Sequence, residues 1–262
     1  MSKNRLGHRA TALVTGATSG IGLEFARILI NAGCNVIIVG RNPEKLQNAA
    51  SELNLPSGNM IRMDLARKEA ADELFSECST RRFEVDILIN NAGMFFWEGM
   101  CPEILPEAEK MINLHEITPM RLCVLFGEEM KKRGCGYIVN VASAAAQLPF
   151  PGLSCYSGTK AFLKNFSKSL YHEYRPHGVR VCALCPAAVS TGLYGLKQNL
   201  LDFGTRTWFI QKASATARGA LKAVKHGRKV CYPAVMCYYL PVLLKITPGP
   251  LIRLIWRKAK KL

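Results

Sequence analysis

The feature that most constrains the fold is a glycine-rich turn between an apolar segment and an amphipathic segment near the start of the chain. Residues 10–14 predict a short strand, and the pattern from 20 to about 32 predicts a helix. The turn between them reads Thr15-Gly16-Ala17-Thr18-Ser19-Gly20-Ile21-Gly22. Glycines permit a tight turn and close backbone approach, and a helix N-terminus favours phosphate. The segment is therefore a candidate dinucleotide-binding element. Its glycine spacing differs from GxGxxG, and an ordinary strand-to-helix turn is the alternative.

Strand and helix patterns alternate along the rest of the chain. Further apolar runs that predict strands occupy 35–39, 85–89, 137–142 and 179–184, with a final strand at 230–232. Helical patterns occupy about 43–53, 67–79, 106–133, 155–175 and 213–226. This alternation predicts an α/β fold, a doubly wound parallel sheet of Rossmann type in three layers. We expect a single domain over 1–232, with a substrate loop at about 187–212, and a C-terminal tail at 233–262.

A tyrosine and a lysine, Tyr156 and Lys160, lie four residues apart within the predicted helix 155–175. Residues at i and i+4 share a helix face, so the ammonium can stand beside the phenol and lower its pKa from about 10. Ser143 follows the strand at 137–142 and can hold an oxygen next to that phenol. These groups suit proton exchange with a carbonyl. Taken alone, the pair is also typical of a half-buried ring beside a solvated charge.

The predicted parallel sheet brings the motifs together. Gly16, Asn90, Ser143 and Pro186 each follow a predicted strand. Ligands of such sheets bind at the carboxyl ends of the strands. We therefore expect one site at that edge.

At this point the sequence resembles the short-chain dehydrogenase/reductase family. The shared motifs are TGxxxGIG at 15–22, Asn90-Asn91-Ala92-Gly93, Ser143 and Tyr156-x-x-x-Lys160, in that order and spacing. Asn113 falls at the position of the family's fourth catalytic residue. Residues 186–191 match a Pro-Gly-x-Val-x-Thr segment, with Ala187 in place of the glycine. The resemblance covers roughly residues 8–232.

The resemblance implies a role for each matched residue. Tyr156 would donate the proton, Ser143 would orient the carbonyl, and Lys160 would bind the nicotinamide ribose. Asn113 would anchor a water that resupplies protons through Lys160, and Thr191 would hold the carboxamide. The expected catalytic residues are Asn113, Ser143, Tyr156 and Lys160. The expected cofactor contacts are Gly16, Thr18, Ser19, Gly20, Ile21, Gly22, Arg41, Asp64, Leu65, Asn91, Ala92, Gly93, Tyr156, Lys160, Pro186, Val189 and Thr191.

The end of the second predicted strand indicates which nicotinamide cofactor is used. NAD-specific sites usually place a carboxylate there for the ribose 2′-hydroxyl, whereas this chain has Gly40-Arg41-Asn42. Arg41 can pair with a 2′-phosphate, which favours NADP(H). The alternative is that Arg41 is a solvated loop charge. Asp64 matches the position that contacts adenine, or else caps the following helix.

Apolar residues surround the expected substrate position. They include Leu193, Tyr194, Leu196, Leu200, Leu201, Phe203, Trp208, Phe209 and Ile210 in the substrate loop, and Phe95, Phe96, Trp97, Leu148, Pro149, Phe150 and Leu153 opposite. A large hydrophobic ketone fits this lining better than a sugar does. Core or lid packing is the alternative for each of these residues.

The C-terminal tail combines apolar and cationic segments. Residues 230–244 contain no charge, 251–256 are apolar except for Arg253, and the chain ends in a basic run. This composition favours peripheral contact with a membrane interface over a span, and a hydrophobic flap or subunit contact is the alternative. The net charge of +16 suits anionic lipid or an acidic carrier. Without a nucleic-acid-binding motif, we expect no nucleic acid partner.

The cysteines indicate a reducing compartment. Ten are scattered through predicted strands and helices, and the N-terminus shows no apolar signal segment, so we expect cytoplasmic protein, peripheral on a membrane's cytoplasmic face if the tail binds lipid. The Cys182-Ala183-Leu184-Cys185 segment favours core packing over a metal or redox role. We expect no metal site. The resemblance implies a homodimer or homotetramer formed through helices 106–133 and 155–175.

These observations predict an NADPH-dependent reductase that interconverts a hydrophobic ketone and its secondary alcohol. Within the family, similar enzymes act on steroids, 3-ketosphinganine and long-chain 3-oxoacyl thioesters. An NAD-linked dehydrogenase working in the oxidative direction is one alternative. A non-enzymatic, nucleotide-sensing protein on the same scaffold is another.

Overall fold

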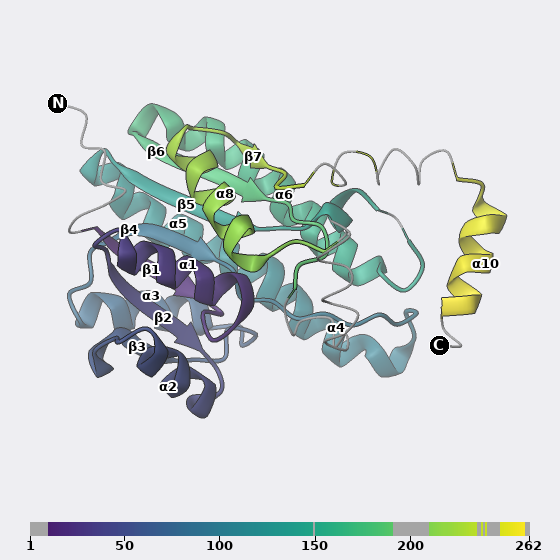
Figure 1. Ribbon diagram of the computed structural model, residues 1–262, viewed down its shortest axis with the longest axis horizontal. Helices are drawn as coiled ribbons and strands as arrows, with labels where there is room; N and C mark the ends of the chain where they lie inside the picture. Colours follow the sequence, from purple (N-terminus) through teal and green to yellow (C-terminus); the bar gives the residue numbers. More distant parts are fainter. Residues whose placement is uncertain are drawn as a thin grey trace.

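The computed structural model describes residues 10–148, 150–190, 210–234, 237, 239 and 247–259. Its centre is a seven-stranded sheet with the order β3-β2-β1-β4-β5-β6-β7, and every pair of neighbouring strands is parallel (Figure 1). The strands are β1 (Thr11–Thr15), β2 (Asn35–Gly40), β3 (Met60–Arg62), β4 (Val85–Asn90), β5 (Gly136–Val141), β6 (Val179–Leu184) and β7 (Val230–Cys231). The predicted α/β fold with a doubly wound parallel sheet is confirmed.

Helices cover both faces of the sheet. One face carries α1 (Gly20–Asn31), α2 (Pro43–Glu52) and α8 (Ala213–Lys225). The other carries α3 (Ala70–Thr80), α5 (Thr118–Arg133) and α6 (Ser154–Tyr174). The other helical segments in the described part of the chain are η1 (Ser57–Asn59), η2 (Pro102–Ile104), α4 (Leu105–Ile112), η3 (Asn113–Ile117), η4 (Ala144–Gln147), η5 (Arg175–His177) and α10 (Gly249–Ala259).

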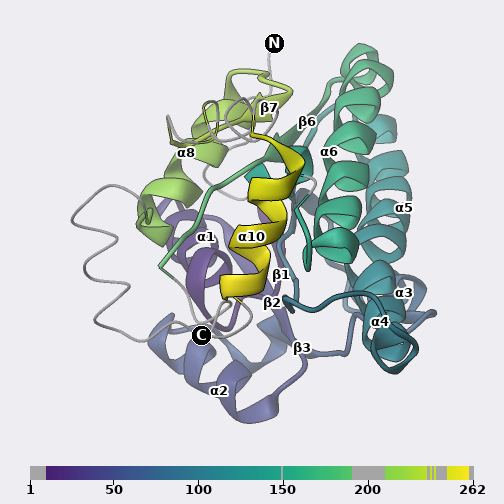
Figure 2. The same cartoon turned by 90° about the vertical axis from the view of Figure 1, so that its right-hand side faces the viewer.

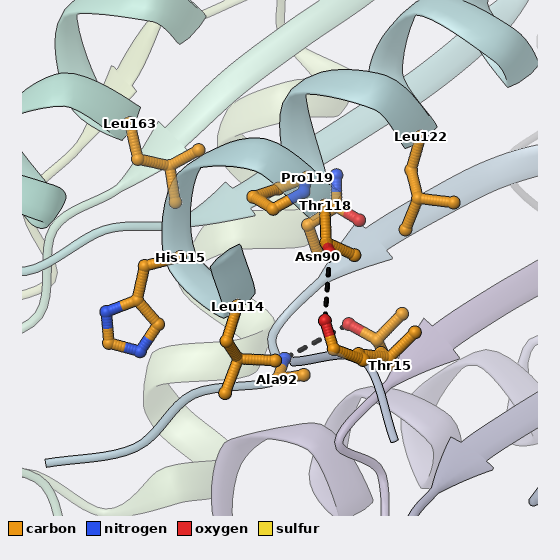
Figure 3. Close-up of a pocket in the computed structure, with 10 residues that line it drawn as sticks. Thr15, Asn90, Ala92, Leu114, His115, Thr118, Pro119, Leu122 and Leu163 are labelled. Atoms are coloured by element: carbon orange, nitrogen blue, oxygen red, sulfur yellow. Dashed lines mark hydrogen bonds between the residues drawn. The ribbon is translucent and has the colours of Figure 1, made fainter. Parts of the chain in front are cut away.

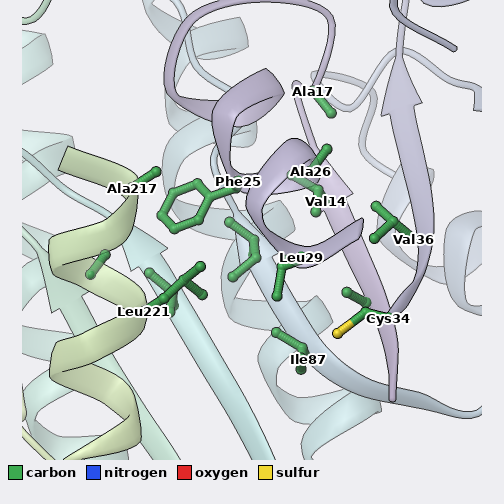
Figure 4. Close-up of a cluster of buried hydrophobic side chains, with 14 of the residues drawn as sticks. Val14, Ala17, Phe25, Ala26, Leu29, Cys34, Val36, Ile87, Ala217 and Leu221 are labelled. Atoms are coloured by element: carbon green, nitrogen blue, oxygen red, sulfur yellow. The ribbon is translucent and has the colours of Figure 1, made fainter. Parts of the chain in front are cut away.

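The core explains why the strand segments are apolar throughout. Every residue of β4 and β5 is buried, because helices cover the sheet on both sides. On the α1 side, Phe25 and Leu29 pack toward Ala217 and Leu221 of α8 across the strands (Figure 4). This packing holds α1, and with it the glycine-rich turn, against the sheet.

The predicted helix 106–133 is wrong in one respect, because a π-helical turn divides it. Pro119 lacks the N–H that would bond to the carbonyl of His115, so the regular α-helical pattern cannot continue there. The helix widens, and the amide of Thr118 bonds to the carbonyl of Asn113. Such π turns are frequent at functional sites. This one begins at the predicted catalytic residue Asn113.

The carboxyl ends of the strands meet at one edge of the molecule. Segments that follow β1, β2, β4, β5 and β6 all emerge there, and α10 lies across this edge (Figure 2). The described site residues predicted from the sequence therefore lie at the same edge of the molecule as α10. Among the described residues, no helix has both the length and the apolar character needed to cross a membrane.

Candidate active site

Lys160 is a buried cation that ties the helix α6 to the end of β5. Its Nζ donates a hydrogen bond of 3.0 Å to the carbonyl of Val141, and the residue is only 5 % exposed. Nζ lies 5.8 Å from the centroid of the Tyr156 ring, one helical turn earlier. Burial lowers the pKa of the Lys160 ammonium from 10.5 to about 8. The i, i+4 spacing thus places a poorly solvated positive charge beside the tyrosine, as predicted.

Ser143 lies just beyond β5 and starts the short helix η4. Its Oγ accepts a hydrogen bond of 3.1 Å from the amide of Ala145, which caps η4. Because the oxygen is the acceptor there, the hydroxyl keeps its own proton for donation to another oxygen. The neighbouring amide of Ala144 donates to the carbonyl of Pro186 at 2.8 Å. The loops after β5 and β6 are therefore joined at the predicted catalytic serine.

The Tyr156 ring is held by aromatic neighbours from two segments. It makes edge-on contacts with Phe95, at 5.1 Å between centroids, and with His115, at 5.8 Å. The residue is buried, and Met94 and Phe96 pack against the same cluster. The loop that follows β4 thus fixes the orientation of the predicted proton donor.

His115 is a site residue that the sequence interpretation missed. Its Nε2 accepts a hydrogen bond of 3.0 Å from the amide of Met94. Its Nδ1 lies 3.0 Å from Oγ1 of Thr159, and that hydroxyl donates to the carbonyl of Tyr156 at 2.9 Å. Since Nε2 must accept, Nδ1 carries the proton and donates to Thr159. Burial, with a smaller contribution from the Lys160 charge, lowers the pKa of His115 well below 6.5.

The neutral His115 therefore links the loop after β4 to the catalytic helix. The sequence alone places this histidine within the predicted helix 106–133 and gives it no partner at metal-ligand spacing. Its position two residues after Asn113 was the one available signal. Asn113 itself is half-buried at the first position of η3.

The glycine-rich turn forms a cradle that tolerates no side chains at its key positions. A Cβ on Gly22 would lie 2.3 Å from the carbonyl oxygen of Gly16, and Gly16 itself has φ +63°. The Nδ2 of Asn91 donates to the carbonyls of Thr15 and Gly16, each at 3.0 Å. In Figure 3 the Thr15 hydroxyl accepts from the amide of Ala92, at 3.0 Å. The loops after β1 and β4 are thereby locked together.

The start of α1 fits a pyrophosphate group. Ser19, the residue before the helix, makes no side-chain cap, and the first turn contains no acidic residue. The N–H groups at this end therefore remain for an anion, which the helix dipole also favours. Thr18 packs over Gly40, and a Cβ added to Gly40 would lie only 2.6 Å from Cγ2 of Thr18. Arg41 follows at once, exposed and without an ion pair to any described residue.

The remaining predicted cofactor residues lie along the same edge. Asp64 is exposed, and its Oδ1 accepts from the amide of Ala66 at 3.1 Å. This bond stabilises a turn and not α3, which begins at Ala70, so the alternative role of Asp64 as a helix cap is wrong. Leu65 is buried and its carbonyl accepts from the Thr118 hydroxyl at 2.8 Å.

The segment after β6 is described as far as Ser190 and again from Ile210. Val189 is buried and pairs with Gln211 in a short parallel bridge. Ala187, which replaces the family's glycine, does not have a positive φ, so its Cβ causes no backbone strain. Thr191, Pro149 and most of the expected substrate loop lie outside the described residues.

Three comparisons place the chain among known proteins. The family model for short chain dehydrogenases matches residues 10–199. The chain belongs to the short-chain dehydrogenase family. It is 32 % identical over 214 residues to the very-long-chain 3-oxoacyl-CoA reductase of Homo sapiens, covering 78 % of this chain and 67 % of the relative. It is 31 % identical over 225 residues to the 17-beta-hydroxysteroid dehydrogenase type 3 of Mus musculus, covering 84 % and 70 %.

A solved relative agrees with the fold of this short-chain dehydrogenase. The short-chain dehydrogenase of Sphingobium yanoikuyae, in complex with NADPH, superposes with a TM-score of 0.76 at 26 % identity. The match covers 92 % of this chain and 97 % of the solved one. This short-chain dehydrogenase is thus an oxidoreductase of a family that uses NAD(H) or NADP(H).

A small pocket of this dehydrogenase lies beside the π turn that begins at Asn113. It is bounded by the end of β4, the π turn and the start of α5, with Leu163 of α6 also in its wall (Figure 3). Asn90 supplies a polar group to it, and the buried Oδ1 of Asn90 lacks a hydrogen-bond partner among the described residues. A buried amide oxygen of this kind is suited to an ordered water.

The CxxC segment has the surroundings of packing residues. Cys182 and Cys185 are fully buried at β6, and burial raises the pKa of both thiols, that of Cys185 to about 12. Such thiols are poor nucleophiles. Within the described part of the chain, no cluster of three His, Cys, Asp or Glu side chains could hold a metal ion.

Proposed function

We propose that this dehydrogenase is an NADPH-dependent reductase that converts a large hydrophobic ketone into its secondary alcohol. The observation that carries the proposal is the catalytic pair: Tyr156 and the desolvated Lys160 on one face of α6, with the Ser143 hydroxyl at the end of β5. This arrangement supplies both a proton and a hydrogen bond to a carbonyl oxygen.

The residues act in a definite order on that oxygen. The cofactor supplies the hydride. As negative charge develops on the carbonyl oxygen, Ser143 stabilises it by donating a hydrogen bond, and Tyr156 donates the proton. With a pKa of about 8, Lys160 is still mostly charged at neutral pH and stabilises the phenolate that remains. Asn113 lies at the π turn, where a water could return the proton through Lys160.

Arg41 supports a preference for NADP(H). The Arg41 side chain is exposed directly after β2, and Thr18 of the glycine-rich turn packs over the preceding Gly40. Arg41 can therefore approach the 2′-phosphate of a dinucleotide on that turn. No carboxylate occupies the end of β2 to accept from a 2′-hydroxyl. The structural relative bound to NADPH agrees with this preference.

A hydrophobic substrate is supported by the surroundings of Tyr156. Phe95, Phe96 and Met94 pack around the buried ring, so the approach to the proton donor is apolar on that side. The names of the two relatives, a very-long-chain 3-oxoacyl-CoA reductase and a hydroxysteroid dehydrogenase, indicate substrates of the same character. Both names describe substrates with a large apolar part, a very long acyl chain in one and a steroid in the other.

Two variants on α6 test the role of Tyr156. The change Tyr156→Phe removes the phenolic proton while keeping the ring and its contacts with Phe95 and His115. We expect NADPH binding, measured by cofactor fluorescence, within about twofold of the parent, and turnover at least about 100-fold lower. The control is Tyr171→Phe on the same helix, whose hydroxyl bonds to Arg175 at 2.8 Å. Near-normal turnover by the Tyr156→Phe variant would show that another group donates the proton.

Self-association through α5 and α6 is a further part of the proposal. It is supported by the two long helices that lie side by side on the same face of the sheet (Figure 2). Sedimentation equilibrium of the full chain provides the test. A dimer or tetramer agrees with the proposal, and a monomer at micromolar concentration contradicts it.

A further inference from the structure

The helix α10 is fastened to the two loops that frame the active site. The Trp256 ring lies 5.9 Å from the Trp97 ring, and a Cβ added to Gly152 would fall 2.3 Å from Trp256 Cζ3. Trp97 also donates from Nε1 to the carbonyl of Pro151 at 3.1 Å. The Trp97 loop continues from Gly93, and the Gly152 loop continues from Ser143. Trp256 therefore brings α10 to the mouth of the site.

The opposite side of α10 exposes apolar side chains that the fold leaves uncovered. Leu251 and Leu254 are 47 % and 49 % exposed, one helical turn apart, whereas Ile252 and Trp256 are half-buried, and Trp256 contacts the loops. The exposed Leu pair is flanked by the exposed Arg253 and Arg257. An apolar strip bordered by cations is the pattern of a helix that lies in a membrane interface.

Positive charge is also concentrated in the C-terminal part of the chain, which contains α10. Residues 245–262, which include α10, contain six Lys and Arg but no Asp or Glu. Anionic lipid headgroups attract such segments by about 1 kcal/mol for each Lys or Arg near the surface. An acidic protein face offers no hydrocarbon layer for the exposed leucines. A second copy of this basic chain offers no opposite charge for the arginines.

We propose that the outer face of α10, with the exposed Trp97 beside it, docks the protein on an anionic bilayer. The helix has 11 residues, about 16 Å in length, so it lies along the surface and does not cross the hydrocarbon core. Docking in this orientation turns the loops of the active site toward the lipid. A ketone dissolved in the bilayer then enters from the side that α10 covers. This last consequence rests on the proposed function, whereas the docking does not.

Vesicle flotation of the full chain tests the docking without any substrate. The probes are vesicles of phosphatidylcholine alone and of an equimolar mixture of phosphatidylcholine and phosphatidylglycerol. We expect the protein to float with the anionic vesicles and to be released by high salt. The change Leu254→Asn should weaken binding about tenfold. The variant Arg253→Gln/Arg257→Gln should weaken it about 30-fold.

Matched controls distinguish binding through α10 from non-specific binding by exposed apolar or basic side chains elsewhere. Val124→Asn alters a side chain on α5 that is 45 % exposed, comparable to Leu254. Lys222→Gln/Lys225→Gln removes the same charge from exposed positions on α8. Both controls should float like the parent, and the α10 variants should keep the NADPH affinity and the oligomeric state of the parent. Equal losses in the matched pairs, or no flotation of the parent, would overturn the proposal. A change in oligomeric state for the α10 variants alone would assign the face to a subunit contact instead.

A kinetic measurement then links docking to turnover. With a lipophilic ketone supplied in anionic vesicles, the α10 variants should show a raised KM, while their turnover of a small water-soluble ketone stays unchanged. If vesicles are bound but no ketone of any kind is reduced, the docking stands and the proposed function fails.

Discussion

The buried ammonium of Lys160 should make the active site a source of instability, and removing it should stabilise the fold. The side chain is enclosed at the end of β5, where its ammonium donates a hydrogen bond to the carbonyl of Val141. Burial disfavours its charged form, which the unfolded chain accommodates in water. We therefore expect Lys160→Met, which keeps the length and apolar volume of the side chain, to lose turnover and gain stability.

The size of the gain follows from the pKa. A fall from 10.5 to about 8 corresponds to about 3 kcal/mol of stability at neutral pH. Loss of the bond to the Val141 carbonyl offsets about 1 kcal/mol of this. The net gain of about 2 kcal/mol predicts a rise in Tm of about 4–8 °C for a chain of this size.

The pH dependence identifies the cause. Because the folded pKa of Lys160 is lowered, the unfolded state binds more protons between pH 8 and 10.5, and the stability of the parent rises with pH there. The advantage of the variant should therefore be full below pH 8. It should be smaller by about 2 kcal/mol at about pH 9.5. Buried cysteines also titrate in this range, but they are common to both proteins and cancel in the difference.

Urea unfolding of both proteins without cofactor, at several pH values, gives the required free energies. Cofactor is omitted because it would stabilise the parent by binding. Lys164→Met is the control, since it removes a lysine one turn further along α6 that is only half-buried. A Lys160→Met variant that is less stable than the parent at pH 7, or a difference that does not shrink at high pH, would refute the reasoning.

Three further predictions concern the cofactor cradle and the histidine. Arg41→Asp should weaken NADPH binding by about 10–100-fold and leave NADH binding equal or stronger, as measured by titration of cofactor fluorescence; unchanged NADPH affinity would exclude contact with the 2′-phosphate. Gly22→Ala should lower both Tm and affinity for either cofactor, because its Cβ would meet the Gly16 carbonyl at 2.3 Å; normal affinity would show that the turn is not the pyrophosphate site. His115→Leu should lower kcat and cost about 1–3 kcal/mol by leaving the Met94 amide without its acceptor. The folded pKa of His115 is lowered, so the parent should lose stability as pH falls below 6.5 and the variant should lose less, and equal acid profiles in urea unfolding would contradict this.

Local patterns in the sequence were sufficient to predict the sheet and the position of the catalytic pair. Apolar runs produced the long strands because helices cover both faces, and i, i+4 spacing placed Lys160 beside Tyr156. The short strand β3 at the sheet edge offers only three residues and gives little periodic signal. The π turn depends on Pro119, and the helical pattern of residues 106–133 predicts a continuous helix through that proline.

Long-range contacts account for what the sequence did not reveal. His115 gained its role from Met94 and from Thr159, which lie in other segments of the fold. The apolar residues 251–256 were expected to contact a membrane interface, but their position at the active site depends on a contact between Trp256 and Trp97. Pairing between segments so distant in sequence has no local signature.

The most direct test of the central claim is NADPH oxidation by the purified protein with a panel of ketones, each repeated with NADH and with the alcohol product identified by mass spectrometry. The panel contains long-chain 3-oxoacyl-CoA thioesters, steroid ketones, 3-ketosphinganine and small polar ketones. We predict turnover of a lipophilic class with NADPH in clear preference to NADH. Reduction of only the small polar ketones, or no reduction despite tight NADPH binding, would contradict the account.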